Sequence, residues 1–357
     1  MRLFEHADFE QAIIQAAEHF AAQGLRPAII EKDYYVTEAL RVIAATGINN
    51  SIIFKGGTSL SKGWNLIQGF SEDIDIFLDP LAFEPPLGKN AIDRKLKRLR
   101  GAVAAHPALT FVEGESQTIG GLGRNDRFAY TQRFGGPGDV ANRVLLEAGT
   151  ASGREPTSII EISSYLTQFL QSRGLSLDAD DERAFPMRLL HFRRTFVEKM
   201  FAIHGKVELL KRDGRALGSY ARDYYDLYCL AARDEVIAML KSAEYAAIKE
   251  DYDRISREHF ERSYFCPEGM CFARSDALFP AGRIVRWNRR GLRRAVPYSL
   301  LHGLSGMARS TGPVSGNARS PVALRKSAHV PRGKASGAFA NVFSGSTRSA
   351  SAVVRGL

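Results

Sequence analysis

One stretch of the sequence, from Gly56 to Asp79, restricts the fold more than any other: GGTSLSKGWNLIQGFSEDIDIFLD. The apolar run before it, SIIF at 51–54, predicts a short strand that ends at two glycines. TSLSKGWNLI predicts a helix, and DIDIFLD alternates polar and apolar residues as a half-buried strand does. In this succession of strand, glycine turn, helix and strand, the glycine turn is a candidate site for phosphate and the second strand is a candidate site for a metal ion.

The two aspartates of the second strand form a candidate metal site. Residues two apart in a strand point the same way, so Asp73 and Asp75 share one face while Ile74 and Ile76 point to the core. Two carboxylates about 4 Å apart repel each other by roughly 4 kcal/mol at an effective dielectric constant of about 20. A divalent cation removes that cost, and Mg²⁺ suits a carboxylate pair combined with substrate phosphate oxygens. An acidic strand end in solvent is the other interpretation of the pair.

The glycine turn is a candidate phosphate site. Its two glycines allow positive φ and a close backbone approach. The helix that follows begins with two hydroxyl side chains, and a helix N-terminus is a natural seat for phosphate. The spacing is not that of a Walker A loop. The candidate nucleotide-binding residues are Gly56, Gly57, Thr58, Ser59 and Lys62, with Lys55 just before the turn.

The rest of the chain divides into a mixed part and a helical part. Helical spacing marks 8–22, 28–46 and 89–106, strands are predicted at 127–134 and 142–149, and GGLG at 120–123 is interpreted as a turn between strands. From about Ala184 the period becomes helical, with helices predicted at 186–212, 218–240 and 242–260. The predicted fold is therefore α+β: a small mixed-sheet domain at 1–180, then a helical domain at 181–276.

The tail at 277–357 differs from the body. It has no Asp or Glu and holds 14 of the 49 Lys and Arg, which leaves 35 basic against 39 acidic residues in the body. The net charge of +10 is thus a property of the tail. A basic arm that binds RNA would have this composition, and so would translation of a GC-rich gene in a shifted frame. We favour the second cause and expect a largely disordered tail.

Composition also excludes several classes of protein. No apolar run approaches the roughly 20 residues of a membrane span, and the N-terminus lacks the apolar region of a signal peptide. Three cysteines are too few for a disulfide framework, and no Cys or His pair completes a zinc site with Cys266 and Cys271. We therefore expect a cytoplasmic protein without a membrane partner.

Five segments together resemble the AbiEii/AbiGii-type toxins of the DNA-polymerase-β-like nucleotidyltransferase superfamily. FKGGTSLSKGWNLIQGFSEDIDIFL is similar to the superfamily signature, in which a glycine pair is followed by two alternating aspartates. AIIEKDYYVTEAL, LLEAGTASGREP, RTFVEKMFAIH and YARDYYDLYCL resemble other blocks of that family in the same order. The resemblance covers roughly 8–275, and it does not extend to the tail.

The resemblance implies catalytic roles for particular residues. Asp73 and Asp75 would bind Mg²⁺, and Glu147, in a predicted neighbouring strand, would be the third carboxylate of the superfamily. Lys199 matches a lysine expected to face the nucleotide, and Asp226 matches an aspartate near it. Asp223, three residues earlier, is an alternative to Asp226, since both could lie on one helix face. The same blocks include Lys32 and Asp33, for which the sequence gives no chemical role.

The function implied is transfer of a nucleoside monophosphate from an NTP to an acceptor hydroxyl. By the same resemblance the protein would be the toxin of a type IV toxin–antitoxin or phage-defence system, with a tRNA as acceptor and an antitoxin encoded alongside. Transfer to a small molecule such as an aminoglycoside is an alternative. A non-catalytic protein that binds nucleotide or RNA is another, although pure binding has little need for paired metal carboxylates.

Overall fold

A single mixed sheet organises the N-terminal part of the computed structural model, which describes residues 1–67, 73–135, 140–214, 221–261, 264, 266 and 270–278. Most of the predicted tail, 279–357, lies outside the described residues. Contacts divide the chain into two compact units, one at Met1–Thr195 and one from Phe196 onward. In the first unit the described residues form eight strands in the order β3-β5-β6-β2-β1-β8-β7, with β4 paired to β5.

The strands join in both directions. They are β1 (Ile52–Lys55), β2 (Asp73–Leu78), β3 (Thr110–Phe111), β4 (Gln117–Ile119), β5 (Gly123–Ala129), β6 (Arg143–Gly149), β7 (Thr157–Ile162) and β8 (Phe185–Leu190). The central strand β2 is antiparallel to β1 and parallel to β6, and β1 is parallel to β8. The predicted mixed sheet is confirmed, and GGLG does form the turn between β4 and β5.

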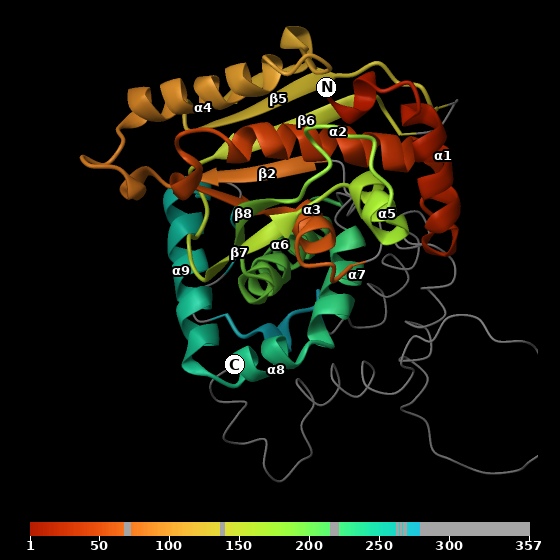
Figure 1. Cartoon of the computed structure of the whole chain (residues 1–357). Helices are drawn as coiled ribbons and strands as arrows, with labels where there is room; N and C mark the ends of the chain where they lie inside the picture. The colour runs from red at the N-terminus through yellow and green to blue at the C-terminus, as the bar shows by residue number, and fades with distance from the viewer. Residues whose placement is uncertain are drawn as a thin grey trace, which may run out of the picture. The chain divides into compact units, whose positions relative to one another are not determined.

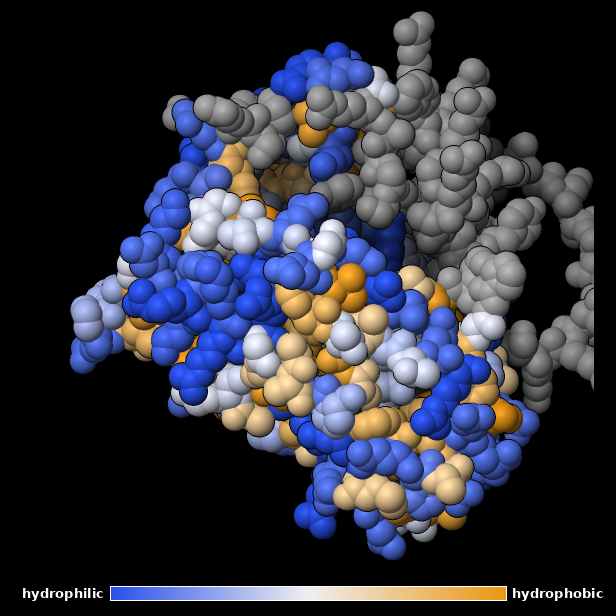
Figure 2. Space-filling model, turned by 90° about the horizontal axis from the view of Figure 1, so that it is seen from above, coloured by the Kyte–Doolittle hydropathy of each residue, from blue (hydrophilic) through white to orange (hydrophobic). Residues whose placement is uncertain are grey.

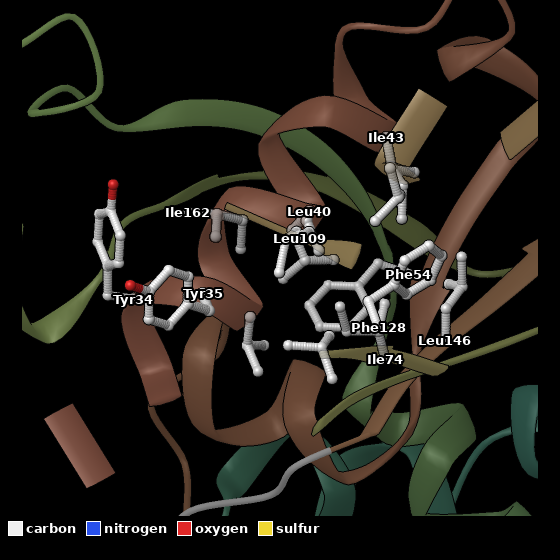
Figure 3. Packing of buried hydrophobic residues seen from close by; sticks show 14 of the residues in the cluster. Tyr34, Tyr35, Leu40, Ile43, Phe54, Ile74, Leu109, Phe128, Leu146 and Ile162 are labelled. Atoms are coloured by element: carbon white, nitrogen blue, oxygen red, sulfur yellow. The ribbon is translucent and has the colours of Figure 1, made fainter. Parts of the chain in front are cut away.

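Helices cover one face of this sheet (Figure 1). The first unit contains α1 (Phe9–His19), α2 (Pro27–Ala44), α3 (Gly56–Lys62), α4 (Lys89–Ala104) and α5 (Tyr165–Arg173). α2 contacts β6 and β8, and α4 contacts β5 and β3. Figure 3 shows Leu40 and Ile43 of α2 in one cluster with Phe54, Ile74 and Phe128 of the sheet. This packing orients the opposite set of strand side chains away from the main core.

α2 is buried along most of its length, including its charged residues. It begins at Pro27, a residue suited to the first helical position because its missing N–H has no partner there anyway. Its buried charges are hydrogen-bonded: Glu31 accepts from two backbone N–H groups at 133 and 134, and Lys32 Nζ lies 2.9 Å from the carbonyl oxygen of Ala141. The block that includes Lys32 and Asp33 therefore ties α2 to distant loops.

The second unit is helical in its described part. α6 (Phe192–Asp213) continues into it from the first unit, and α7 (Ala221–Ala231), α8 (Asp234–Leu240) and α9 (Ala243–Phe260) follow. Phe201 of α6 stacks on Tyr252 of α9, with ring centroids 4.5 Å apart. The Tyr224 hydroxyl donates to the carbonyl of buried Ala277, so this unit includes the chain up to at least Leu278.

Three predicted helices differ from the structure. The helix predicted from TSLSKGWNLI begins at Gly56 and ends at Lys62, five residues earlier than expected. The predicted helix at 186–212 is wrong at its start, because 185–190 form β8 and pair with β7 and β1. Alternate residues Phe185, Met187 and Leu189 are buried there, and strand pairing on both sides overrides the helical spacing. The predicted helix at 218–240 is two helices over its described residues, 221–240, because Arg233 is extended and α8 begins after it, at Asp234. None of the described helices combines the length and apolar content that a membrane span needs.

Candidate active site

Four strands place polar residues in one row across the sheet. Lys55 of β1 is in register with Asp75 of β2, Asp75 with Glu147 of β6, and Glu147 with Asn125 of β5. Residues in register point to the same side of a sheet, so these four side chains share one face. Ile74 and Ile76 point to the other face, into the main core, as predicted. We call Lys55, Asp75, Glu147 and Asn125 the polar row.

Carboxylates gather on this row. Asp73 lies two residues before Asp75 and therefore on the same face, at the exposed start of β2. Burial, followed by the negative charges of Asp75 and Asp73, raises the pKa of Glu147, and the charge of Lys55 opposes that shift. Asn125 Nδ2 donates to Glu147 Oε1 at 2.9 Å. The predicted residues Asp73, Asp75 and Glu147 are thus close enough for their charges to interact.

The chemistry of this donor set fits Mg²⁺. Within the described residues, no group of three or more His, Cys, Asp or Glu side chains is placed to hold a metal ion. Mg²⁺, however, is usually bound through one or two carboxylates together with waters and substrate phosphates, so it does not require a complete protein cage. Burial is the main cause of the raised pKa of Glu147, and the charges of Asp75 and Asp73 add to it; a divalent cation would offset that added repulsion.

Gly56 brings the turn into contact with this row. Its φ is +75°, and a Cβ built there would lie 2.0 Å from Asp75 Oδ2. The predicted positive φ and close approach are therefore both present at Gly56, and what approaches is the carboxylate of Asp75. Gly57 is the second residue of α3. A role for Gly56 and Gly57 in holding nucleotide phosphates stays a prediction.

The predicted hydroxyl ligands are directed inward. Thr58 is 2% exposed, and its Oγ1 donates to the carbonyl oxygen of Asp73 at 2.5 Å. Ser59 is fully buried, and its Oγ donates to the carbonyl oxygen of Gly56 at 2.8 Å. In this structure both hydroxyls hold α3 to its neighbours: Thr58 joins α3 to the start of β2, and Ser59 closes the first turn of the helix.

Lys62 is in a buried ion pair away from the polar row. Its Nζ lies 2.7 Å from Asp33 Oδ1 of α2, and the two side chains are only 5% and 3% exposed. Asp33 Oδ2 also accepts the backbone N–H of Tyr165, at the start of α5. Burial lowers the pKa of Lys62, although the charge of Asp33 opposes that effect. The structure thus gives Asp33 and Lys62 a shared role, because they fasten the end of α3 to α2 and α5.

A second charged cluster lies in the second unit. Lys199 Nζ of α6 is 2.6 Å from Asp223 Oδ1 and 2.8 Å from Asp226 Oδ2 of α7. Burial opposes the positive charge of Lys199, but the two aspartates outweigh it and raise its pKa. Burial raises the pKa of Asp223, with Lys199 pulling it down and Asp226 raising it further. Both candidate aspartates, Asp223 and Asp226, therefore contact the predicted lysine, and the structure does not favour one over the other.

Asn125 is a residue that the sequence did not suggest. It lies inside RNDRFA, where nothing distinguishes it from an ordinary polar position on a half-buried strand. Its place beside Glu147 depends on the register between β5 and β6, and such pairing of distant strands carries no local signature.

Comparison with known proteins identifies the family of the chain. No curated protein matches the chain. Among solved structures, MenT4, a nucleotidyltransferase toxin from Mycobacterium tuberculosis H37Rv, is 17% identical with a TM-score of 0.43, and the match covers 81% of this chain and 92% of that one. The family model described as nucleotidyl transferase AbiEii toxin, type IV TA system, matches residues 38–280, which include the glycine turn, the three carboxylates and the Lys199 cluster. The match extends over more than half of the chain, and the protein therefore belongs to the AbiEii nucleotidyltransferase toxin family of type IV toxin–antitoxin systems.

Proposed function

We propose that this protein transfers a nucleoside monophosphate from an NTP to the hydroxyl of a tRNA, in a reaction that depends on Mg²⁺. The acceptor hydroxyl loses its proton to solvent, its oxygen forms a bond to the α-phosphorus, the bond from that phosphorus to the β-bridging oxygen breaks, and pyrophosphate leaves. The observation that carries the proposal is the polar row, in which Asp75 and Glu147 are in register between Lys55 and Asn125.

The residues of the polar row have different roles in this proposed reaction. Asp73 and Asp75, with Glu147 beside them, would hold Mg²⁺, which supplies an activated acceptor hydroxyl and neutralises charge on the leaving oxygen. Lys55, in register with Asp75, puts a positive charge on the face where the triphosphate would lie. Asn125 fixes the orientation of Glu147 through its 2.9 Å hydrogen bond. Such positioning and charge neutralisation account for most of the catalysis of phosphoryl-type transfer.

The tRNA acceptor and the antitoxin partner rest on family membership. A toxin of a type IV system implies an antitoxin, whose gene we expect alongside. The tRNA acceptor rests on the resemblance of the sequence blocks, and the cytoplasmic site of action is an expectation from composition.

A transfer assay tests the proposal. Each of the four NTPs, labelled at the α-phosphorus, is incubated with total tRNA, Mg²⁺ and the protein, and Asp75→Asn serves as the inactive control. Label on tRNA with wild type and none with the control supports the proposal. Label on an aminoglycoside in a parallel reaction, with none on tRNA, would make the protein a small-molecule nucleotidyltransferase instead.

A further inference from the structure

α4 presents a concentrated positive charge at the surface of the first unit. The helix KNAIDRKLKRLRGAVA contains six Lys or Arg and one Asp. Its apolar residues Ile92, Leu96, Leu99 and Val103 are at most 5% exposed, because they pack onto the sheet and α2. In Figure 1 the helix lies at one side of the first unit, beside β5. Figure 2 views the molecule from above, and hydrophilic residues gather in the left half of the surface.

Three of these cations form one exposed face. Arg94, Lys97 and Arg98 are exposed and follow the spacing i, i+3, i+4, which places them on the same side of the helix. We call these three residues the α4 basic face. Arg94 and Arg98 are about 6 Å apart along the helix axis, a length over which one strand of a duplex presents about two phosphates. The only acidic residue of α4, Asp93, lies 2.7 Å from Lys97 in a partly exposed pair that costs little to break.

Two further cations are held in place beside this face. Lys95 Nζ lies 5.1 Å from the ring centre of Phe83, and the Arg100 guanidinium lies 4.8 Å from the ring centre of Phe111. Contacts of this kind restrict the side chains and keep the charge near the surface. The positive field of α4 is therefore maintained by packing as well as by composition.

The partner that fits this face is a nucleic acid backbone. A membrane surface is a poorer match, because helices that bind membranes insert an apolar face, and the apolar side of α4 is already buried in the core. Lys and Arg that meet phosphates without reading bases supply affinity and orientation, which an enzyme acting on one end of an RNA requires.

The helix is connected to the polar row through β5. Lys89, the first residue of α4, lies over the β4–β5 turn, since a Cβ on Gly121 would be 2.8 Å from Lys89 Cε. β5 starts at Gly123, and Asn125 of the polar row is two residues further along. The carboxylates lie on the face of the sheet opposite to the one that α4 covers, so a strand bound along α4 would have to pass around this turn to reach them.

We propose that the α4 basic face binds the phosphate backbone of the acceptor RNA and directs its end to the polar row. The proposal rests on the proposed function, because it takes RNA as the acceptor. Lys and Arg outside α4, including those of the tail, would contribute unspecific affinity for RNA, so the test compares full-length variants that all retain the tail.

Binding of fluorescein-labelled tRNA is measured by anisotropy without NTP, over a salt series, for wild type and two triple variants. One is Arg94→Gln/Lys97→Gln/Arg98→Gln. The matched control is Arg26→Gln/Arg173→Gln/Arg183→Gln, which removes the same charge from exposed positions of the same unit. Each phosphate contact contributes about −0.7 to the slope of log K against log salt concentration. Loss of three contacts should therefore make that slope shallower by about 2 for the α4 variant and weaken its binding about 100-fold at about 0.1 M salt. The control keeps an affinity close to that of wild type.

Equal affinity of the α4 variant and wild type, or equal losses in both variants, would overturn the proposal. So would binding of wild type to anionic vesicles without binding to tRNA. A second readout needs no variant: bound tRNA should protect Lys97 from acetylation and leave exposed Lys241 reactive, and the reverse result counts against the proposal. The two hypotheses can fail separately. Binding of tRNA through α4 without label transfer would refute only the proposal that tRNA is the acceptor. Label transfer that the α4 variant leaves unchanged at all salt concentrations would refute only the proposal that the α4 basic face binds the RNA.

Discussion

Replacing Gly56 by alanine separates backbone strain from damage to the carboxylates. An L-residue in the left-handed region costs about 1–2 kcal/mol, and Gly56, with φ +75°, would incur that cost. The new Cβ would also lie 2.0 Å from Asp75 Oδ2 and 2.7 Å from Asp75 Cγ. Rotation of the Asp75 side chain would remove the contacts with Oδ2 and Cγ, while Asp75 Cβ, at 3.1 Å, would have to shift by a few tenths of an ångström. Displacement of a reacting group by about 1 Å costs about 100-fold in rate, so we expect at least that loss in nucleotide transfer.

Gly24 is the matched control. Its φ is +74°, and no atom lies within 4 Å of a Cβ built there. Gly24→Ala therefore carries the same backbone cost without touching the polar row. We expect both variants to lower the midpoint of thermal unfolding by a similar amount, while label transfer from an NTP to tRNA falls only in Gly56→Ala. Equal transfer activity in the two variants would refute the reasoning, since it would show that Asp75 is not held where the reaction needs it.

Three other predictions concern the carboxylates of β2, the Lys62–Asp33 pair and Lys199. Asp73→Asn and Asp75→Asn should each abolish nucleotide transfer and leave the melting temperature nearly unchanged or higher, because both relieve carboxylate repulsion; retained transfer in a folded variant would contradict the assignment. Lys62→Met should destabilise the first unit by about 3–5 kcal/mol, because it leaves Asp33 charged and buried. In a thermal melt, adding Asp33→Asn should recover most of that lost stability. A double variant as unstable as the single one would argue against the ion pair. Lys199→Ala should weaken NTP use far more than Lys206→Ala in a kinetic comparison. The raised pKa of Lys199 means that its stabilisation is complete below its ordinary pKa of 10.5 and is lost as pH rises through the folded value, so the difference in stability between wild type and Lys199→Ala should narrow only above about pH 10.5.

The sequence predicted local structure where a short pattern decides it. The alternation of DIDIFL was sufficient for β2 and for the shared face of its two aspartates, because period two is a property of the strand alone. The helices α2, α4 and α9 were predicted within two residues at each end, since each has a long apolar stripe. By contrast, 186–190 has a helical spacing but lies between two strands, and no local pattern shows those neighbours.

Side-chain partners from distant segments were beyond prediction. Lys62 was expected to face a triphosphate because it follows the glycine turn, yet its charge is paired with Asp33, which lies in another helix. Nothing in either local sequence identifies the other residue, because the pair exists only after α2 and α3 pack together. Thr58 and Ser59 are similar, since a hydroxyl at a helix start serves a ligand or a carbonyl equally well until the neighbouring backbone is in place.

The strand order also affects how the protein acquires activity during synthesis. β1 and β2 leave the ribosome early, but the neighbour that supplies Glu147 is β6, and the free edge of β1 is paired only by β8, through Phe54 and Leu189. A nascent chain that has not reached Leu190 therefore lacks a complete sheet around its carboxylates. We expect products that end before β8 to be harmless to the producing cell, which growth assays of fragments ending on either side of β8 would show. The cell would then face active toxin only from chains translated through β8.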